Sequence, residues 1–199
     1  MKKHLIFILI ITMIMLFTGC SKNNAPGDPS GSQSVAEDNI IDSKGNDIGK
    51  ESGVFEGDKA KDFYIEDNSG NGIHLEDLAG KVILLNFWTS WSLHSESMNN
   101  LISEFNEIFG DDINIVSVNV TAGERPNLEY VLKYIETNDY QFPIYFDLDG
   151  NVAKTYLVRS FPTTYIIDSK GYVSRIYVGE AEREEYLQYI NALIEAEKR

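Results

Sequence analysis

The stretch Val82-Ile-Leu-Leu-Asn-Phe-Trp-Thr-Ser-Trp-Ser-Leu-His-Ser95 decides how this chain folds. Residues 82–88 form a continuous apolar run, which is typical of a β-strand that is buried on both faces. Ser92 can then cap a helix, because its side-chain oxygen accepts a hydrogen bond from a free N–H group of the first turn. Apolar residues follow at offsets of three and four, which define one helical face: Met98, Leu101, Ile102, Phe105, Ile108 and Phe109. The sequence therefore predicts a buried strand that leads directly into an amphipathic helix.

The segments on either side of this stretch predict an α/β domain. A second buried strand is expected over residues 113–120, and Pro126 suits the first turn of a second helix. Two strands over residues 163–167 and 173–178 should form a hairpin around the turn at 168–171. The remaining expected apolar helix positions are Leu128, Val131, Leu132 and Ile135 in the second helix, and Tyr186, Leu187, Ile190, Leu193 and Ile194 in the last. The order β-α-β-α-β, hairpin, α predicts a mixed central sheet with helices on both faces.

An N-terminal extension should precede this core. Phe63 and Ile65 alternate with polar residues, and residues 67–72 are rich in turn formers, so a β-hairpin is expected there. Residues 55–199 form the predicted domain, and residues 21–54 form a flexible linker with too few apolar residues to build a core.

The first twenty residues have the layout of a secretory signal. Lys2 and Lys3 precede an apolar run over residues 5–17, which is too short to span a bilayer of about 30 Å. The run ends at Gly19-Cys20 and resembles the lipobox of bacterial lipoproteins, in which the cysteine is lipidated and becomes the mature N-terminus. We therefore expect residues 1–20 to be a lipoprotein signal peptide and the protein to be anchored by lipid on the extracytoplasmic side of a bacterial cell membrane. A plain signal peptide with an incidental cysteine is the alternative.

The overall charge is acidic. The 199 residues contain 17 Lys and Arg against 31 Asp and Glu, for a net charge of −14. Binding to nucleic acid phosphates requires clustered cationic side chains, so nucleic acid is not an expected partner.

Two segments carry a resemblance to a known family. Asn86-Phe-Trp-Thr-Ser-Trp-Ser-Leu-His-Ser95 resembles the active-site segment of TlpA/ResA-like thioredoxins, which reads N-F-W-x-[ST]-W-C-x-x-C. Phe161-Pro-Thr-Thr-Tyr-Ile-Ile-Asp168 is similar to the cis-proline segment of that family, and residues 142–144 and 147–150 also follow it. The resemblance covers roughly residues 55 to 199. It implies a thioredoxin-like fold, a cis bond before Pro162, and descent from extracytoplasmic thiol–disulfide oxidoreductases.

Both cysteines of the resembled motif are serine here. A cysteine at a helix N-terminus has a lowered pKa and supplies thiolate, and a second cysteine one turn later resolves the mixed disulfide. Ser92 and Ser95 can do neither, and Cys20 is the only cysteine in the chain. We therefore expect no catalytic residues and no redox activity. The alternative is a thiol–disulfide oxidoreductase function, in cytochrome c maturation or an envelope thiol pathway, by descent or through an active partner.

Other chemistries find little support in the sequence. Ser92 and His94 invite a hydrolase interpretation, but residues two apart on a helix point to different sides. Residues 147–150 resemble the start of a calcium loop but lack the acid that would close it, so a simple turn is favoured. We expect no metal site and no cofactor.

Binding of a peptide or protein segment is the favoured function. In the resembled family the helix start, the preceding tryptophan and the cis-proline loop form a shallow groove for an extended peptide. The matching residues are Trp91, Leu93, His94, Phe161, Pro162 and Thr163. A segment of an extracytoplasmic protein is the expected partner, and free backbone groups on Phe161 would allow it to pair by strand addition. The alternative for Trp91 and Phe161 is that they complete the core, where Trp88 is expected to lie.

Overall fold

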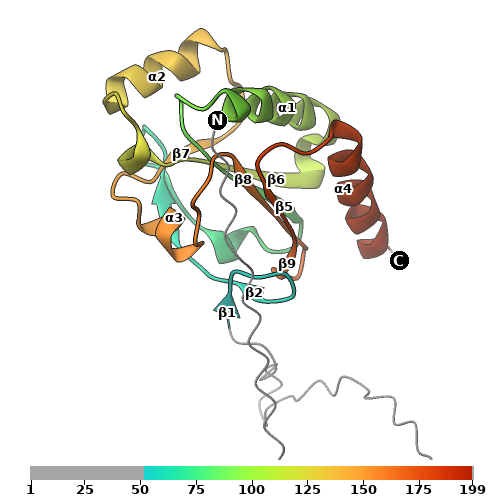
Figure 1. Cartoon of the computed structure of the whole chain (residues 1–199). Coiled ribbons are helices and arrows are strands. Elements are labelled where there is room, and N and C mark those ends of the chain that lie inside the picture. The colour runs from blue at the N-terminus through green and yellow to red at the C-terminus, as the bar shows by residue number, and fades with distance from the viewer. Residues whose placement is uncertain (1–51, 199) are drawn as a thin grey trace, which may run out of the picture. The chain divides into compact units, whose positions relative to one another are not determined.

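The computed structural model describes residues 52–198 (Figure 1). The predicted signal peptide with Cys20, and the predicted linker up to residue 51, lie outside these residues. The elements in chain order are β1 (Ser52–Gly53), β2 (Lys59–Ala60), β3 (Tyr64–Glu66), β4 (Gly72–His74), η1 (Leu75–Leu78), β5 (Val82–Trp88), α1 (Leu93–Phe109), η2 (Gly110–Asp112), β6 (Ile113–Asn119), η3 (Thr121–Gly123), α2 (Leu128–Thr137), β7 (Ile144–Phe146), α3 (Asn151–Thr155), β8 (Thr163–Ile167), β9 (Val173–Val178) and α4 (Arg183–Glu197).

Five strands form the central mixed sheet, in the order β7-β6-β5-β8-β9. β5 and β6 pair in parallel, as do β6 and β7, whereas β8 runs antiparallel to β5 and β9 antiparallel to β8. This confirms the predicted mixed sheet. β5 lies at its centre, and all seven of its residues are buried, as the apolar run predicted.

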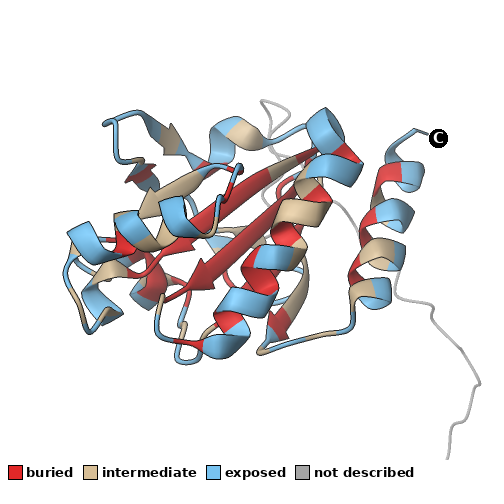
Figure 2. Ribbon diagram, turned by 90° about the horizontal axis from the view of Figure 1, so that it is seen from above, coloured by how far each residue is buried: buried red, intermediate tan, exposed pale blue. Residues whose placement is uncertain are grey.

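Successive side chains of β5 point to opposite faces, so the strand contributes to two cores. Val82 and Leu84 pack with α1 and α4 on one face. Ile83, Leu85 and Phe87 pack with α3 and with the β3–β4 hairpin on the other face. Figure 2 shows the buried strands between helices that are buried only along their inner sides. The second face is thus covered by one short helix and the predicted N-terminal hairpin.

Helix α1 begins where the sequence predicted, with Ser92 as its N-cap. Of the six predicted apolar positions, Ile108 is wrong as a core residue, because its side chain is 49% exposed. At about 100° per residue, Ile108 lies roughly 90° from the centre of the stripe that its buried neighbours form, so it lies at the solvent edge.

Helix α2 begins at Leu128, whereas the prediction placed Pro126 within its first turn. Asn127 is its N-cap and accepts a hydrogen bond from the N–H of Tyr130 at 3.1 Å, so Pro126 lies just before the helix rather than within its first turn. Val131 is the one fully buried residue of this helix. The short elements β1, β2 and α3 were not predicted, because two to five residues are too few to show a period.

The N-terminal edge of the described domain is packed rather than open. The predicted hairpin is present as β3 and β4, paired antiparallel with Ile65 opposite Ile73. Val54 is buried in the same core as Ile65, directly before the predicted domain boundary. Within residues 52–198, no helix combines the length and the apolar character needed to cross a membrane.

Candidate binding site

Ser92 joins the start of α1 to the loop before β8. Its hydroxyl oxygen accepts a hydrogen bond from the N–H of Ser95 at 3.3 Å, as expected for an N-cap. The same hydroxyl donates to the carbonyl oxygen of Phe161 at 3.0 Å, a residue 69 positions away. The Phe161–Pro162 bond is cis, as the resemblance implied. The expectation that the backbone of Phe161 is free is wrong for its carbonyl, because Ser92 occupies it.

Ser95 lies beneath Ser92 and is completely buried. Its hydroxyl has no hydrogen-bond partner among the described residues. Such a side chain gains nothing from being polar, and a thiol would suit the same environment better. The two redox positions of the resembled motif are therefore preserved in shape but hold groups that cannot exchange disulfides.

Two aromatic side chains, Trp91 and Phe161, lie next to Ser92. Trp91 and Phe161 meet edge to face with ring centroids 6.0 Å apart. The indole N–H of Trp91 donates to the carbonyl oxygen of Gly123 at 2.9 Å, and its ring remains 42% exposed. Phe161 is half-buried against the core, whereas Trp88 is fully buried as expected. Trp91 therefore lies at the surface and does not complete the core.

The loop after β6 is held against the site by Glu124. Its carboxylate accepts from the backbone N–H of Ser90 at 2.6 Å and from the Ser90 hydroxyl at 2.7 Å. The side-chain amide of Asn119 donates to it at 2.7 Å. Next to it, the guanidinium of Arg125 lies 4.8 Å from the centre of the Trp91 ring. Sequence analysis missed Glu124 and Arg125, because no local pattern marks a loop that folds back onto another.

Two exposed apolar side chains are carried by neighbouring elements. Leu93 is 79% exposed at the first position of α1, and Val178 is 68% exposed at the end of β9, opposite Thr163. Thr163 itself is buried and donates its hydroxyl to the carbonyl of Ser160 at 2.8 Å. We call the set of Trp91, Leu93, Phe161 and Val178 the apolar groove, after the groove that the resemblance implied.

His94 links α1 to the segment before α4. Its Nδ1 lies 3.0 Å from a carboxylate oxygen of Glu180, and its side chain is exposed. Hydrogen bonding to His94, together with Ser97, holds the pKa of Glu180 below its usual value. His94 is therefore paired with an acid, while the Ser92 hydroxyl donates to a carbonyl. This arrangement is not that of a serine nucleophile with its base.

The acidic turn at residues 147–150 has a structural role. Asp147 is buried and accepts from the backbone N–H groups of Val152 and Ala153 at 3.2 and 2.8 Å. Burial raises its pKa, against the effect of these hydrogen bonds. In residues 52–198, no three His, Cys, Asp or Glu side chains are grouped to hold a metal ion.

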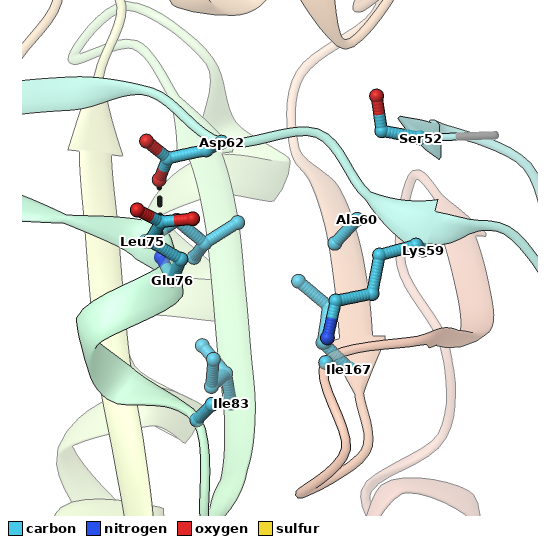
Figure 3. A pocket seen from close by; sticks show the side chains of 10 residues that line it. Ser52, Lys59, Ala60, Asp62, Leu75, Glu76, Ile83 and Ile167 are labelled. Carbon is cyan, nitrogen blue, oxygen red and sulfur yellow. Dashed lines mark hydrogen bonds between the residues drawn. The ribbon is translucent and has the colours of Figure 1, made fainter. Parts of the chain in front are cut away.

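A hollow lies at the other end of β5 and β8 from Ser92 (Figure 3). It has a volume of ≈ 260 Å³, and its apolar wall includes Leu75, Ile83 and Ile167. Asp62 and Lys59 lie on opposite sides of it. Asp62 accepts from the backbone N–H of Glu76 at 3.0 Å and pairs with His74 at 2.8 Å, and the ammonium of Lys59 donates to the carbonyl of Lys170. Asp62 and Lys59 are thus hydrogen-bonded within the domain.

The fold and the Ser92–Ser95 helix start define a thioredoxin-like protein whose redox cysteines are replaced by serine. Comparison with known proteins agrees with this class, since residues 56–176 match the AhpC/TSA family. The thioredoxin-like protein YneN of Bacillus subtilis is 35% identical over 142 residues, which cover 71% of this chain and 82% of YneN. The thiol-disulfide oxidoreductase ResA of the same organism is 31% identical over 146 residues, covering 73% of this chain and 79% of ResA. The chain belongs to the AhpC/TSA family, as a thioredoxin-like relative of ResA and YneN.

Solved structures confirm the thioredoxin-like fold. The exposed lipoprotein thioredoxin Etrx1 of Streptococcus pneumoniae superimposes with a TM-score of 0.60 at 29% identity, covering 67% of this chain and all of Etrx1 (100%). StoA of Bacillus subtilis superimposes with a TM-score of 0.58 at 25% identity, covering 65% of this chain and 96% of StoA.

Proposed function

We propose that this protein is a redox-inactive thioredoxin-like lipoprotein that binds an extended segment of an extracytoplasmic protein or peptide. The observation that carries the proposal is the pairing of Ser92 with Phe161 at the redox position. Without a second cysteine the chain cannot form an internal disulfide, yet the helix start and the cis-proline loop retain their contact. A surface kept in shape without its redox chemistry supports binding as the function.

The apolar groove supplies the binding surface. Leu93, Trp91 and Val178 expose large apolar areas around Phe161, and such a cluster is stabilised by contact with apolar side chains of a partner. Among residues 52–198, the N–H of Phe161 makes no hydrogen bond. Its carbonyl has a second lone pair, so both groups can pair with an extended backbone. Apolar or aromatic side chains on that segment would then contact Leu93 and Trp91.

The cell membrane is the proposed location. Gly19-Cys20 at the end of the apolar leader supports lipid attachment at Cys20. Etrx1, similar in fold and 29% identical, is an exposed lipoprotein by its name. Metabolic labelling with an alkynyl fatty acid tests this placement, since the label should attach to the wild-type chain and be absent from Cys20→Ala.

A thiol–disulfide pathway is the second candidate function. The similarity to ResA, a thiol-disulfide oxidoreductase, favours it. Because Ser92 and Ser95 cannot exchange disulfides, this protein would act there only by holding an active oxidoreductase or its substrate. Both candidates therefore predict a protein partner at the groove.

Site-specific photo-crosslinking in native cells tests the proposal. A benzoylphenylalanine probe at Leu93 should capture a discrete partner, and the same probe at Ile108 should not. Ile108 is an exposed apolar residue of the same helix, about 22 Å along its axis from Leu93. Pro162→Ala should weaken the capture at Leu93. Equal background at both probes, in a folded and abundant protein, would overturn the binding function.

A further inference from the structure

Arg125 is the arginine whose guanidinium lies over the exposed ring of Trp91. The ion pairs of arginine among residues 52–198 involve Arg175 and Arg183, each with glutamate, but neither Arg125 nor the exposed Arg159. Arg125 is exposed and instead stacks on Trp91, with 4.8 Å between its guanidinium carbon and the ring centre. It is therefore a cation without a carboxylate partner at the edge of the apolar groove.

The neighbouring acids are already bound to other groups. The carboxylate of Glu124 accepts three hydrogen bonds, two from Ser90 and one from Asn119. Glu180, in the segment before α4, pairs with His94. Neither acid forms an ion pair with Arg125, although the chain as a whole carries a net charge of −14.

The position of Arg125 is fixed by its surroundings. The loop that carries it is attached to the β5–α1 loop through Glu124 and through the hydrogen bond from Trp91 to Gly123. The guanidinium lies over the Trp91 ring, and an attraction between a cation and an aromatic ring does not use up its N–H donors. A guanidinium held in this way can bind a carboxylate through two parallel hydrogen bonds with little further loss of side-chain freedom.

We propose that Arg125 determines the specificity of the groove by binding an Asp or Glu side chain of the partner, next to the apolar residue that contacts Trp91 and Leu93. The preferred partner is an extended segment in which an acidic residue lies beside an apolar or aromatic one. This inference rests on the proposed binding function and names the chemistry of its partner. Charge complementarity carries it, because Arg125 forms no ion pair within residues 52–198 and its guanidinium lies over the exposed Trp91 ring.

Selection from a phage-displayed library of random octapeptides tests the inference. The immobilised full-length protein should enrich peptides that join an apolar residue to Asp or Glu. Synthetic versions of the selected peptides, with both termini blocked, should bind the wild-type chain about 5-fold more tightly than Arg125→Gln, as expected for one exposed ion pair. Changing their Asp or Glu to Asn or Gln should remove this difference. Lys133→Gln, which removes a positive charge from the exposed side of α2, is the matched control and should not alter the affinity.

The outcomes separate the two proposals. Selected peptides without acidic enrichment, or with equal affinity for Arg125→Gln, would overturn the role of Arg125. If those peptides lost affinity for Leu93→Asp, the groove would remain a binding site. Failure to select any peptide that depends on Leu93 would overturn both proposals. Binding of the synthetic peptides only when their C-terminus is left free would also overturn the side-chain carboxylate as the ligand.

Binding can be followed through Trp91. The chain has two tryptophans, and Trp88 is fully buried, so quenching by acrylamide reports mainly on Trp91. A bound acidic peptide should reduce this quenching in the wild-type chain. Unchanged quenching at a saturating peptide concentration would place the peptide elsewhere and overturn the inference.

Discussion

The two ends of β5 carry two different kinds of surface. At its C-terminal end, Trp91 and Leu93 are exposed, and the guanidinium of Arg125 lies over the Trp91 ring. At its N-terminal end, the hollow in Figure 3 contains the charged residues Asp62 and Lys59, but both are hydrogen-bonded within the domain. The number of charged residues therefore does not identify the binding end. What distinguishes the C-terminal end is the exposed aromatic and apolar surface beside Arg125.

The largest expected effect comes from restoring the two cysteines. Ser92→Cys with Ser95→Cys should give a disulfide between these positions that dithiothreitol reverses, because the Cys pair would stand one helical turn apart at the helix start. Ser95 is buried without a hydrogen-bond partner among the described residues, so its replacement should not destabilise the domain. Mass spectrometry of alkylated peptides measures the bond and distinguishes it from pairing with Cys20. Either single variant serves as the control, and a double variant that stays reduced under mild oxidation would contradict the geometry of the site.

A pair of leucine substitutions sharpens the contrast between the two ends. Leu75 is 3% exposed beside the far hollow, so Leu75→Ala should lower the free energy of unfolding by about 2–5 kcal/mol. Leu93 is 79% exposed, so Leu93→Ala should change it by no more than about 0.5 kcal/mol. Urea denaturation measures both values.

Binding should show the opposite order for the same two variants. Peptide affinity should fall for Leu93→Ala and stay unchanged for Leu75→Ala at temperatures where the latter is folded. Equal losses of affinity in both variants would mean that the two ends are not functionally distinct.

A smaller effect is expected at the helix cap. Ser92→Ala removes the cap of α1 and should lower the free energy of unfolding by about 1 kcal/mol. It also leaves the Phe161 carbonyl without its donor, which should add up to about 1 kcal/mol. Asn127→Ala is the matched control, because Asn127 caps α2 without a second contact to a distant loop. If the two variants lost equal stability, the hydrogen bond to Phe161 would contribute nothing measurable.

The smallest expected effect concerns the pKa of His74, which pairs with Asp62 beside the hollow in Figure 3. The hydrogen bond to Asp62 raises the pKa of His74 above its ordinary value of 6.5. Burial works to raise the pKa of Asp62, but hydrogen bonds from Glu76 and His74 outweigh it and leave that pKa below 3.8. Asp62→Asn should therefore shift the His74 midpoint, measured by NMR, back toward 6.5.

The sign of the pH dependence follows from these directions. The stabilisation by protonated His74 is fully present below pH 6.5 and is lost as the pH rises through the raised pKa. The stabilisation by ionised Asp62 is present above pH 3.8 and is lost as the pH falls through the lowered pKa. The pair should contribute most between about pH 4 and 6.5. A midpoint of His74 that is unchanged in Asp62→Asn would show that the pair does not form in solution.

Local patterns predicted the elements that build the core. The apolar run at residues 82–88 and the serine cap at Ser92 each depend on the neighbouring residues alone, and both were found as predicted. Helix α3 escaped prediction because five residues show no clear period. Ile108 matched the helical spacing but is exposed, because spacing does not reveal how wide a stripe the sheet covers.

The register of the β8–β9 hairpin could not be predicted from the sequence. Ile167 pairs with Val173 beside the turn, but a shift between Ile166 and Ile167 places Val178, rather than Tyr177, opposite Thr163. Counting outward from the turn would put the wrong residue beside the groove. A bulge of this kind is set by contacts across the whole sheet, so the hairpin sequence alone does not locate it.

The fold class, the start of α1 and the presence of a single cysteine follow from the sequence alone, because they depend on local periodicity, one cap and a count of cysteines. Only the tertiary structure brought Phe161 to Ser92, Glu124 to Ser90 and Arg125 to Trp91. These residues are separated by 34 to 69 positions. Contacts across such separations arise when packing of the two cores fixes where the loops return, and no short stretch of sequence encodes that placement.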